Sequence, residues 1–318
     1  MNNETSAAVG SRLASGRNLL IVSHVRPDGD AVGSLLGLGL AMQASGKQVQ
    51  MVLADGVPSA FRHLPGADQI KTSVPSDFDT FITVDCADYK RTGRIFASFR
   101  PPDINIDHHI TNEKFAGINL VEGQEVATSA ILTNYLPSWG CPITAPIAAA
   151  LLTGIITDTL GFRTSNVTPE AMRQVATLME TGVDMPDLYM RGLVRRSYAA
   201  ARYWARGLSS LERLDGIVYG TLTLEDRKAV RYSGSDDADL INVLSAIDGF
   251  KVALIFVEQP KDHVKISWRA LEPGIDVSAV AMRFGGGGHA AAAGADVEGS
   301  LADVTKSVTK STKEMLSL

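Results

Sequence analysis

The chain has 318 residues, of which 45% are hydrophobic and 20% are charged, and its formal net charge is −5. A chain of this length predicts a globular protein of about two domains. The acidic balance argues against a protein that coats long nucleic acid, because such proteins depend on many contacts of Lys and Arg with phosphates. The two cysteines form no CxxC pattern, so the sequence indicates neither a disulfide framework nor a structural zinc site.

The sequence carries no signal for export or membrane insertion. The N-terminus lacks the basic stretch followed by an apolar one that a signal peptide requires. No apolar run reaches the roughly 18 residues that a membrane-spanning helix needs. We therefore expect a cytoplasmic protein without a membrane partner.

Short apolar strands alternate with helices over the first half of the chain. The predicted strands cover 19–23, 48–54, 81–85 and 104–107, and the predicted helices cover 31–43, 127–136, 145–160 and 169–182. This alternation predicts an α/β fold with a mostly parallel sheet flanked by helices. In such sheets, ligands bind beyond the carboxyl ends of the strands.

The second half begins with one long predicted helix, followed by a smaller α/β domain. Its predicted strands cover 216–224, 251–259 and 263–270, and its predicted helices cover 237–248, 276–284 and 300–316. We therefore expect a first domain over 1–187, a connector helix over 188–214 and a second domain over 215–318.

Aspartates and histidines follow the ends of three predicted strands and lie in one apolar helix. They are His24, Asp28, Asp30, Asp85, Asp107, His108, His109 and Asp158. Such carboxylates repel one another and are costly to bury, so we expect a positive group among them. Carboxylates mixed with imidazoles suit Mn²⁺, Mg²⁺ or Fe²⁺, and this many ligands favours a two-metal site that hydrolyses phosphate esters.

Two of the aspartates at strand ends have a simpler explanation. Asp30 is well placed to cap the helix that follows it, and Asp88 is expected only to cap the following turn.

Four segments resemble, in order, the motifs of the DHH phosphoesterases. They are HVRPDGDAVGS (24–34), VDCAD (84–88), IDHH (106–109) and TDT (157–159). A fifth, DVSAVAMRFGGGGHAAAAG (276–294), resembles the glycine-rich motif of the DHH-associated C-terminal domain. The resemblance extends over nearly the whole chain, from about residue 18 to about residue 315.

The resemblance implies the metal ligands and their division between two Mn²⁺ ions, with Mg²⁺ or Fe²⁺ as alternatives. One ion would be held by His24, Asp28 and Asp85. The other would be held by Asp30, Asp85, His108 and Asp158, so that Asp85 is shared. It also implies that Asp107 orients the imidazoles and that His109 lies near the substrate phosphate. Asp85, Asp107 and His109 are thus the expected catalytic residues.

The glycine-rich loop and a preceding strand carry the expected substrate-binding residues. A run of glycines alone is typical of a flexible hinge, but glycines also let backbone N–H groups approach an anion. The resemblance implies that the substrate contacts Ser267, Arg269, Gly286, Gly287, Gly288 and His289. Arg163 is a further candidate, which would either contact substrate or neutralise the acidic cluster.

Five arginines fall on one face of the expected connector helix. They are Arg191, Arg195, Arg202, Arg206 and Arg213. Such a stripe would form either a positive wall for an oligonucleotide or a solvated helix face, and the solvated face is the commoner arrangement.

The resemblance implies a metal-dependent phosphodiesterase or phosphatase that attacks phosphorus with a hydroxide bridging two metals. Within this family, the chain most resembles the stand-alone bacterial branch. The members of that branch are homodimeric oligoribonucleases that degrade very short RNA and dephosphorylate 3′-phosphoadenosine 5′-phosphate (pAp). A soluble phosphodiesterase for cyclic di-AMP or its linear product pApA is the alternative within the family. A catalytically inactive nucleotide-binding protein is the alternative from another class.

Overall fold

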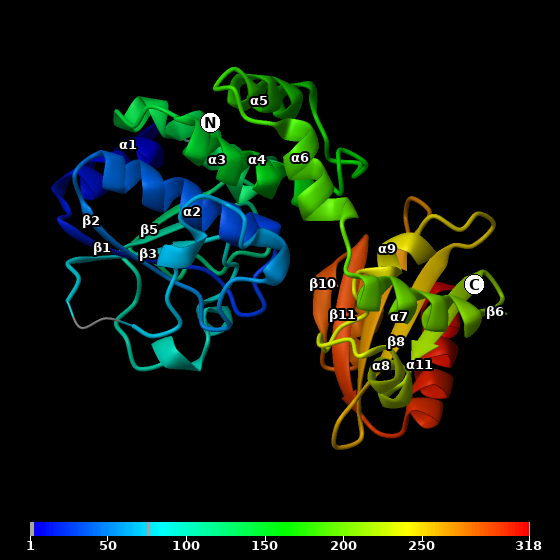
Figure 1. Cartoon of the computed structure of the whole chain (residues 1–318). Helices are drawn as coiled ribbons and strands as arrows, with labels where there is room; N and C mark the ends of the chain where they lie inside the picture. The colour runs from blue at the N-terminus through cyan, green and yellow to red at the C-terminus, as the bar shows by residue number, and fades with distance from the viewer. Residues whose placement is uncertain (1–2, 75–76, 318) are drawn as a thin grey trace. The chain divides into compact units, whose positions relative to one another are not determined.

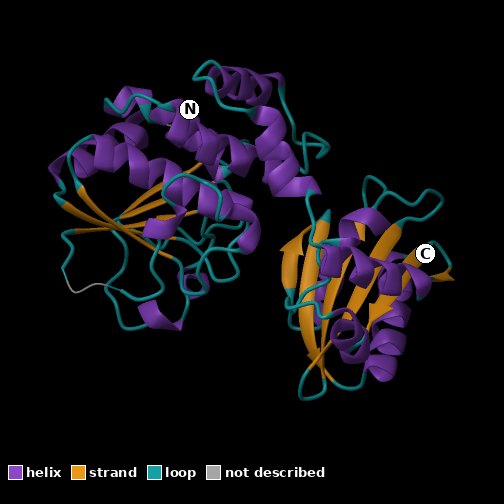
Figure 2. Ribbon diagram, in the orientation of Figure 1, coloured by secondary structure: helices purple, strands orange, loops and turns teal. Residues whose placement is uncertain are grey.

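The computed structural model describes residues 3–74 and 77–317, and the chain divides into two units, Met1–Arg195 and Arg196–Leu318. Each unit joins one β-sheet with helices (Figures 1 and 2). The predicted α/β class, with a parallel N-terminal sheet and a smaller C-terminal α/β part, is confirmed.

Five parallel strands form the sheet of the first unit in the order β2-β1-β3-β4-β5. They are β1 (Asn18–Val22), β2 (Gln48–Val52), β3 (Thr80–Val84), β4 (Ile104–Asp107) and β5 (Ile118–Val121). The strand order changes direction at β1, with β2 on one side and β3 on the other. Such a switch point leaves a crevice beyond the carboxyl ends of the two central strands, where ligands bind in open α/β sheets.

Helices cover one face of this sheet (Figure 2). The helices of the first unit are α1 (Asn3–Ser15), α2 (Gly29–Ala44), α3 (Thr128–Tyr135), α4 (Ala145–Asp158), α5 (Pro169–Met179) and α6 (Met185–Tyr189). Short 3₁₀ helices lie at Ser59–Phe61, Ala67–Gln69, Tyr89–Thr92, Arg94–Phe96 and Pro137–Trp139. On the other face, Phe96 stacks on Phe81 of β3 with ring centroids 5.9 Å apart. Both faces of the central strands are therefore buried, which explains their continuous apolar runs.

Helices α2 and α4 pack closely enough to require glycine at their contact. A Cβ atom added to Gly33 would lie 2.5 Å from the carbonyl oxygen of Ala150, and one added to Gly154 would lie 2.7 Å from Asp30 Oδ1. A larger residue at Gly33 would have to displace backbone. This close approach brings Asp30, in the first turn of α2, toward the end of α4 that carries Asp158.

Six strands form the mixed sheet of the second unit in the order β10-β11-β9-β8-β7-β6. They are β6 (Glu212–Leu214), β7 (Ile217–Leu222), β8 (Val252–Gln259), β9 (His263–Ala270), β10 (Gly287–His289) and β11 (Ala292–Glu298). The helices are α7 (Tyr198–Ser209), α8 (Leu224–Val230), α9 (Leu240–Leu244), α10 (Val277–Arg283) and α11 (Leu301–Leu316). Two hydrophobic clusters separate the faces, with α10 and α11 on one side and α7, α8 and α9 on the other.

The prediction of a single connector helix over 188–214 is wrong. Helix α6 ends at Tyr189, a π-helical turn covers Met190–Val194, and Arg195 is extended. The Ser197 side chain then accepts a hydrogen bond from the Ala200 backbone N–H and starts α7 as a new helix. An extended residue and a new N-cap break the helical repeat that the arginine spacing suggested.

The five arginines predicted on one helix face therefore lie on different elements. Arg191 lies in the π-helical turn and forms an ion pair with Asp187, with Nε 2.6 Å from the carboxylate. Arg206 lies on α7, 3.8 Å from Asp226. The predicted continuous positive stripe does not form among these described residues.

The structure also contains elements that were not predicted: α1, β5, β6, α8 and the strands formed by the glycine-rich segment. Residues 287–298, expected to begin as a loop, form the hairpin β10–β11 at the edge of the second sheet. Glycine and alanine have low strand propensity, so the sequence gives little sign of this hairpin.

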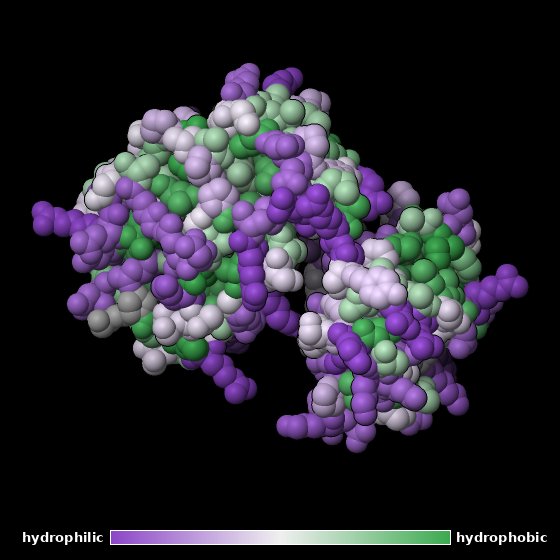
Figure 3. Space-filling model, in the orientation of Figure 1, coloured by the Kyte–Doolittle hydropathy of each residue, from purple (hydrophilic) through white to green (hydrophobic). Residues whose placement is uncertain are grey.

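No helix in the described part of the chain has both the length and the apolar character needed to cross a membrane. On the face drawn in Figure 3, hydrophobic residues are interspersed with hydrophilic ones on both units.

Candidate metal centre

The carboxyl ends of β1, β3 and β4 and the end of α4 bring the predicted ligands of the first unit together. Three overlapping groups have ligand atoms within 4.8 Å of one another. They are His24, Asp28 and Asp85; Asp30, His108 and Asp158; and Asp85, His108 and His109. The first group has the members predicted for one ion, and the second has those predicted for the other apart from the shared Asp85.

His24 presents one ring nitrogen to two carboxylates. Its Nδ1 lies 2.9 Å from the Val25 carbonyl oxygen, which can only accept, so Nδ1 carries the proton. Its Nε2 lies 3.5 Å from Asp85 Oδ2 and 3.7 Å from Asp28 Oδ2. The imidazole is therefore held in the tautomer that leaves Nε2 for a metal ion.

Asp28 both caps α2 and faces His24. Its Oδ1 accepts hydrogen bonds from the backbone N–H groups of Asp30 and Ala31, at 3.1 and 3.0 Å. The N-cap of this helix is thus Asp28, and the alternative explanation of Asp30 as the cap is wrong.

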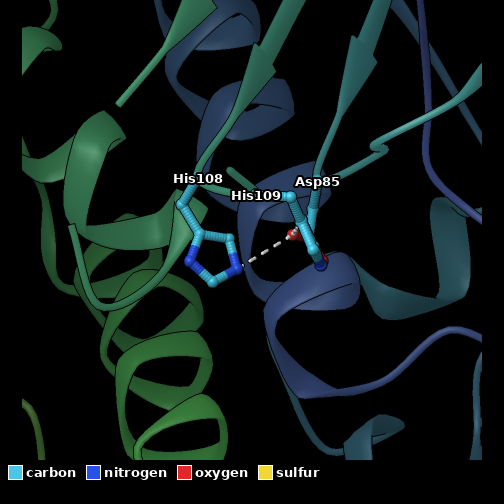
Figure 4. Close-up of side chains that lie close together, drawn as sticks. All are labelled: Asp85, His108 and His109. Atoms are coloured by element: carbon cyan, nitrogen blue, oxygen red, sulfur yellow. Dashed lines mark ion pairs between the residues drawn. The ribbon is translucent and has the colours of Figure 1, made fainter. Parts of the chain in front are cut away.

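His108 repeats the arrangement of His24 at the end of β4. Its Nδ1 lies 3.3 Å from the carbonyl oxygen of Glu125. Its Nε2 lies 3.5 Å from Asp158 Oδ2 and 3.8 Å from Asp85 Oδ1, and Figure 4 shows the ring directed at Asp85. Asp85 therefore faces an imidazole from each group.

These separations are too long for hydrogen bonds but suit atoms that share an ion. Ligands bound at about 2 Å from one hard divalent ion lie about 3 to 4 Å from each other, depending on the angle between them. The chemistry of the donors, carboxylate oxygen and imidazole nitrogen, also suits Mn²⁺, Mg²⁺ or Fe²⁺. The residues thus fit the two divalent ions that the sequence analysis expects.

Asp107 is buried and engaged with His109. Its Oδ1 lies 2.7 Å from His109 Nδ1, and its Oδ2 accepts a hydrogen bond from Asn112 Nδ2 at 2.6 Å. His109 Nδ1 also lies 3.7 Å from Asp85 Oδ1. The geometry fits the predicted orienting role of Asp107, and Asn112 is a partner that the sequence analysis missed.

Asp85 occupies an unusual backbone conformation directly after β3. Its φ is +53°, in the left-handed region, where Asp and Asn are tolerated better than most other residues. Its backbone N–H donates to the Ile106 carbonyl oxygen at 2.9 Å, which ties the turn to the next strand. Both its backbone and its carboxylate therefore favour Asp at this position.

The acidic cluster carries more negative charge than its imidazoles offset. Burial raises the pKa of Asp30 to about 7, and the charge of Asp85 adds to the shift. Burial and the charges of Asp30 and Asp28 also raise the pKa of Asp158. Burial alone would raise the pKa of Asp85 as well, but the imidazoles, His24 first among them, outweigh burial and lower it. Without an ion, protons must supply the positive charge that the cluster needs.

The pKa values of the imidazoles of His24 and His109 are shifted in the direction that this excess of carboxylates requires. Burial alone would lower the pKa of His24 and of His109, but Asp85 and Asp28 outweigh it at His24, and Asp107 and Asp85 outweigh it at His109. Both pKa values are raised.

Most of the predicted substrate-binding residues lie on one face of the second sheet. Arg269 of β9 pairs with Ala292 of β11, which pairs with His289 of β10. One pleat away, Ser267, Gly294 and Gly287 form the parallel row. Because directly paired residues share a face, Arg269, Ser267, His289 and Gly287 point to the same side.

The remaining predicted glycines do not share this face. Gly288 alternates to the other side of β10, and Gly286 precedes the strand. A Cβ atom added to Gly287 would meet no described atom within 4 Å, so the shared face is open there.

The guanidinium of Arg269 is partly satisfied within the unit. Its Nη1 donates to the Trp268 carbonyl oxygen at 3.0 Å, and its Nη2 lies 3.5 Å from Asn242 Oδ1. Its Nε is buried without a hydrogen-bond partner among the described residues. Each Nη carries two N–H groups and uses one in these contacts, so the guanidinium has further donors for an anion.

Arg163 and Asp88 lie outside the metal centre and have different environments. Arg163 is exposed, and its Nε donates to the Leu160 carbonyl oxygen at 3.0 Å; no ion pair links it to the acidic cluster in the residues described. The Asp88 side chain accepts from the Arg91 backbone N–H at 3.1 Å, which confirms the prediction that Asp88 caps a turn.

Two known domain families match the chain, one in each unit. The DHH family, N-terminal domain, matches residues 18–155, and the DHHA1 domain matches residues 231–316. A Thermus thermophilus protein named bifunctional oligoribonuclease and PAP phosphatase NrnA is 34% identical to this chain, over 88% of this chain and 84% of its own. The Bacillus subtilis protein of the same name is 22% identical, over 88% and 89%.

Solved structures share the fold. An exopolyphosphatase-related protein from Bacteroides fragilis superposes with a TM-score of 0.89 at 24% identity, over 99% of this chain and 98% of its own. An exonuclease RecJ bound to manganese has a TM-score of 0.50 at 15% identity, over 99% and 94%.

Asp85→Asn tests whether both groups depend on the shared carboxylate. Asparagine keeps the size and tolerates the positive φ, but it removes the charge. We expect Mn²⁺ affinity, measured by calorimetric titration, to fall by more than the roughly 10–100-fold that loss of an outer-shell partner costs. Asp88→Asn makes the same change at a residue outside the three groups and should bind Mn²⁺ like the wild type. Unchanged affinity and stoichiometry in Asp85→Asn would contradict a shared ligand.

Mn²⁺ binding should release protons and strengthen as the pH rises. The raised pKa values of Asp30 and Asp158 mean that the ion-free protein holds protons which the metal must displace. Between about pH 6 and about pH 8 fewer of these protons remain, so affinity should increase. Titrations at one pH in buffers of different ionisation enthalpy count the protons released. A Mn²⁺ affinity independent of pH in this range would show that the cluster is not protonated in the ion-free state.

Proposed function

Because the chain belongs to the DHH family, we propose that it is a metal-dependent phosphodiesterase and phosphatase that hydrolyses very short oligoribonucleotides and pAp. The observation that carries the proposal is the pair of carboxylate–imidazole groups on either side of Asp85. The similarity to a protein named oligoribonuclease and PAP phosphatase over most of both chains supports this choice of substrates.

In this proposal the residues 1–187 form the catalytic domain and the residues 215–318 bind substrate. His24, Asp28 and Asp85 hold one ion, and Asp30, Asp85, His108 and Asp158 hold the other. Two divalent ions, Mn²⁺ or alternatively Mg²⁺ or Fe²⁺, would supply an activated water and charge stabilisation at the phosphoryl oxygens.

The chain's own contribution begins with orientation. Backbone carbonyl oxygens accept from Nδ1 of His24 and of His108. These contacts fix the tautomer that leaves each Nε2 unprotonated and facing the carboxylates. Asp107 holds Nδ1 of His109 and, with Asp85, favours the protonated ring. A cationic imidazole suits a charge-assisted hydrogen bond to a phosphoryl oxygen, which is the role we propose for His109.

The second unit would hold a further anionic part of the substrate. Arg269 offers further N–H groups on Nη1 and Nη2, and Ser267 and His289 lie on the same face of the sheet. Gly287 leaves that face open at its edge. This arrangement suits a phosphate or nucleotide held against the sheet. Arg163, which is exposed, stays a candidate for substrate contact.

The proposal also includes a cytoplasmic location and a homodimer. The homodimer rests on the resemblance to the stand-alone bacterial branch alone.

A substrate panel tests the proposal. Purified protein with Mn²⁺ is assayed against a five-nucleotide RNA, pAp, pApA and cyclic di-AMP, with and without a chelator. We expect chelator-sensitive turnover of the short RNA and of pAp. Preference for cyclic di-AMP or pApA would reassign the protein to cyclic-dinucleotide turnover. Nucleotide binding without turnover of any substrate would identify a catalytically inactive binding protein.

Arg269→Ala should weaken substrate capture and leave the metals bound. A hydrogen bond to a charged group is worth roughly 1.5–3 kcal/mol, so KM should rise by about 10- to 150-fold. Lys265→Ala removes a positive charge from the same strand and serves as the matched control. Steady-state kinetics and a Mn²⁺ titration check both effects. Unchanged KM, or loss of Mn²⁺, would contradict the role proposed for Arg269.

A further inference from the structure

The first turn of α3 lies against two of the clustered carboxylates. Thr128 and Ser129 begin this helix, and Ala127 before them provides no side-chain cap. The backbone N–H of Thr128 donates to Asp30 Oδ2 at 2.7 Å, and that of Ser129 donates to Asp30 Oδ1 at 3.0 Å. Asp30, which lies on α2, therefore satisfies two of the free N–H groups at the start of α3.

These contacts leave Asp30 with one place for a metal ion. Its Oδ1 accepts from Ser129 N–H and from Ser34 Oγ, the latter at 3.2 Å, so both lone pairs are used. Its Oδ2 accepts only from Thr128 N–H among the hydrogen bonds of the described residues. A metal would therefore bind Asp30 through Oδ2, the oxygen next to Thr128.

The hydroxyl of the same threonine reaches the other carboxylate. Thr128 Oγ1 donates to Asp85 Oδ1 at 3.1 Å, and both side chains are buried. That oxygen also lies 3.8 Å from Nε2 of His108, while Asp85 Oδ2 faces His24 at 3.5 Å. A carboxylate shared by two ions must keep both oxygens in place, and this hydroxyl fixes the rotation of the group.

Two other buried threonine hydroxyls within helices of this unit do something different. Thr133 Oγ1, on the same helix, donates to the Ser129 carbonyl oxygen at 2.8 Å, one turn earlier. Thr153 Oγ1, on α4, donates to the Ala149 carbonyl oxygen at 2.8 Å. These are the usual local bonds of helical threonines. Thr128 instead bonds to a residue 43 positions earlier in the chain.

We propose that Thr128 is a positioning residue that couples the two metal subsites, holding Asp30 by its backbone N–H and Asp85 by its hydroxyl. The inference rests on the proposed function, since it assigns Asp30 and Asp85 as metal ligands. Its consequence is that loss of one hydroxyl should disturb binding of both ions, because Asp85 serves both.

Thr128→Val tests this inference. Valine keeps the shape and the backbone N–H but removes the hydroxyl. We expect Mn²⁺ affinity, measured by calorimetric titration of the full chain, to fall roughly 10–100-fold, as for outer-shell partners of metal ligands. Thr128→Ser restores the hydroxyl and should return the affinity to near that of the wild type. Thr133→Val makes the same chemical change on the same helix, away from the carboxylates, and should bind Mn²⁺ normally.

The outcomes separate this inference from the proposed function. Wild-type Mn²⁺ affinity in Thr128→Val overturns the positioning role, while turnover by the wild type leaves the proposed function standing. Equal losses in Thr133→Val and Thr128→Val, or no rescue by serine, would assign the effect to helix packing and also overturn it. Absence of Mn²⁺ binding and turnover in the wild type would overturn the proposed function and this inference with it. Thermal unfolding without metal checks folding, and Thr128→Ala, judged by the same criteria, replaces a valine variant that does not fold.

Discussion

Three converging carboxylates, two of them buried, are the constraint on which the first unit depends. Asp30 and Asp85 are only 1% and 2% exposed, and burial together with the charge of Asp30 raises the pKa of Asp158. Burying like charges together is costly unless donors and cations compensate. The fold supplies the N–H groups of α3 and the imidazoles of three histidines, and divalent ions would complete the balance.

Several residue choices far from one another follow from this single centre. Asp28 caps α2 with one oxygen and faces His24 with the other, so one side chain both starts the helix and offers a ligand. Gly154 lacks a side chain because Asp30 and Ser129 occupy the space where its Cβ would lie. The parallel sheet contributes by placing the carboxyl ends of β1, β3 and β4 at one edge, which no antiparallel arrangement of the same strands would do.

The sequence was sufficient to predict the groups that gather at strand ends. Apolar runs that stop at His24, Asp85 and Asp107 mark both the end of a strand and a ligand-type residue. The partners of Asp30 could not be predicted in this way, because Thr128 and Ser129 bind it through backbone N–H groups that have no sequence signature and lie 98 and 99 residues away. The prediction of a single connector helix was wrong for a local reason. The arginines recur at a helical spacing across Ser197, although Ser197 is the N-cap of a new helix.

The two units carry different kinds of chemical groups. Metal ions held by carboxylates and imidazoles can activate water toward any phosphate ester. The ligands clustered in the first unit do not distinguish a base or a sugar. The second unit carries a guanidinium with a hydroxyl and an imidazole on the same face of its sheet, and that face is open at Gly287. Short RNA, pAp and pApA all carry more than one phosphate, so each has an anionic group to spare for such a face. The proposed function therefore assigns the binding of this second anionic group to Arg269 and its neighbours rather than to the metal centre.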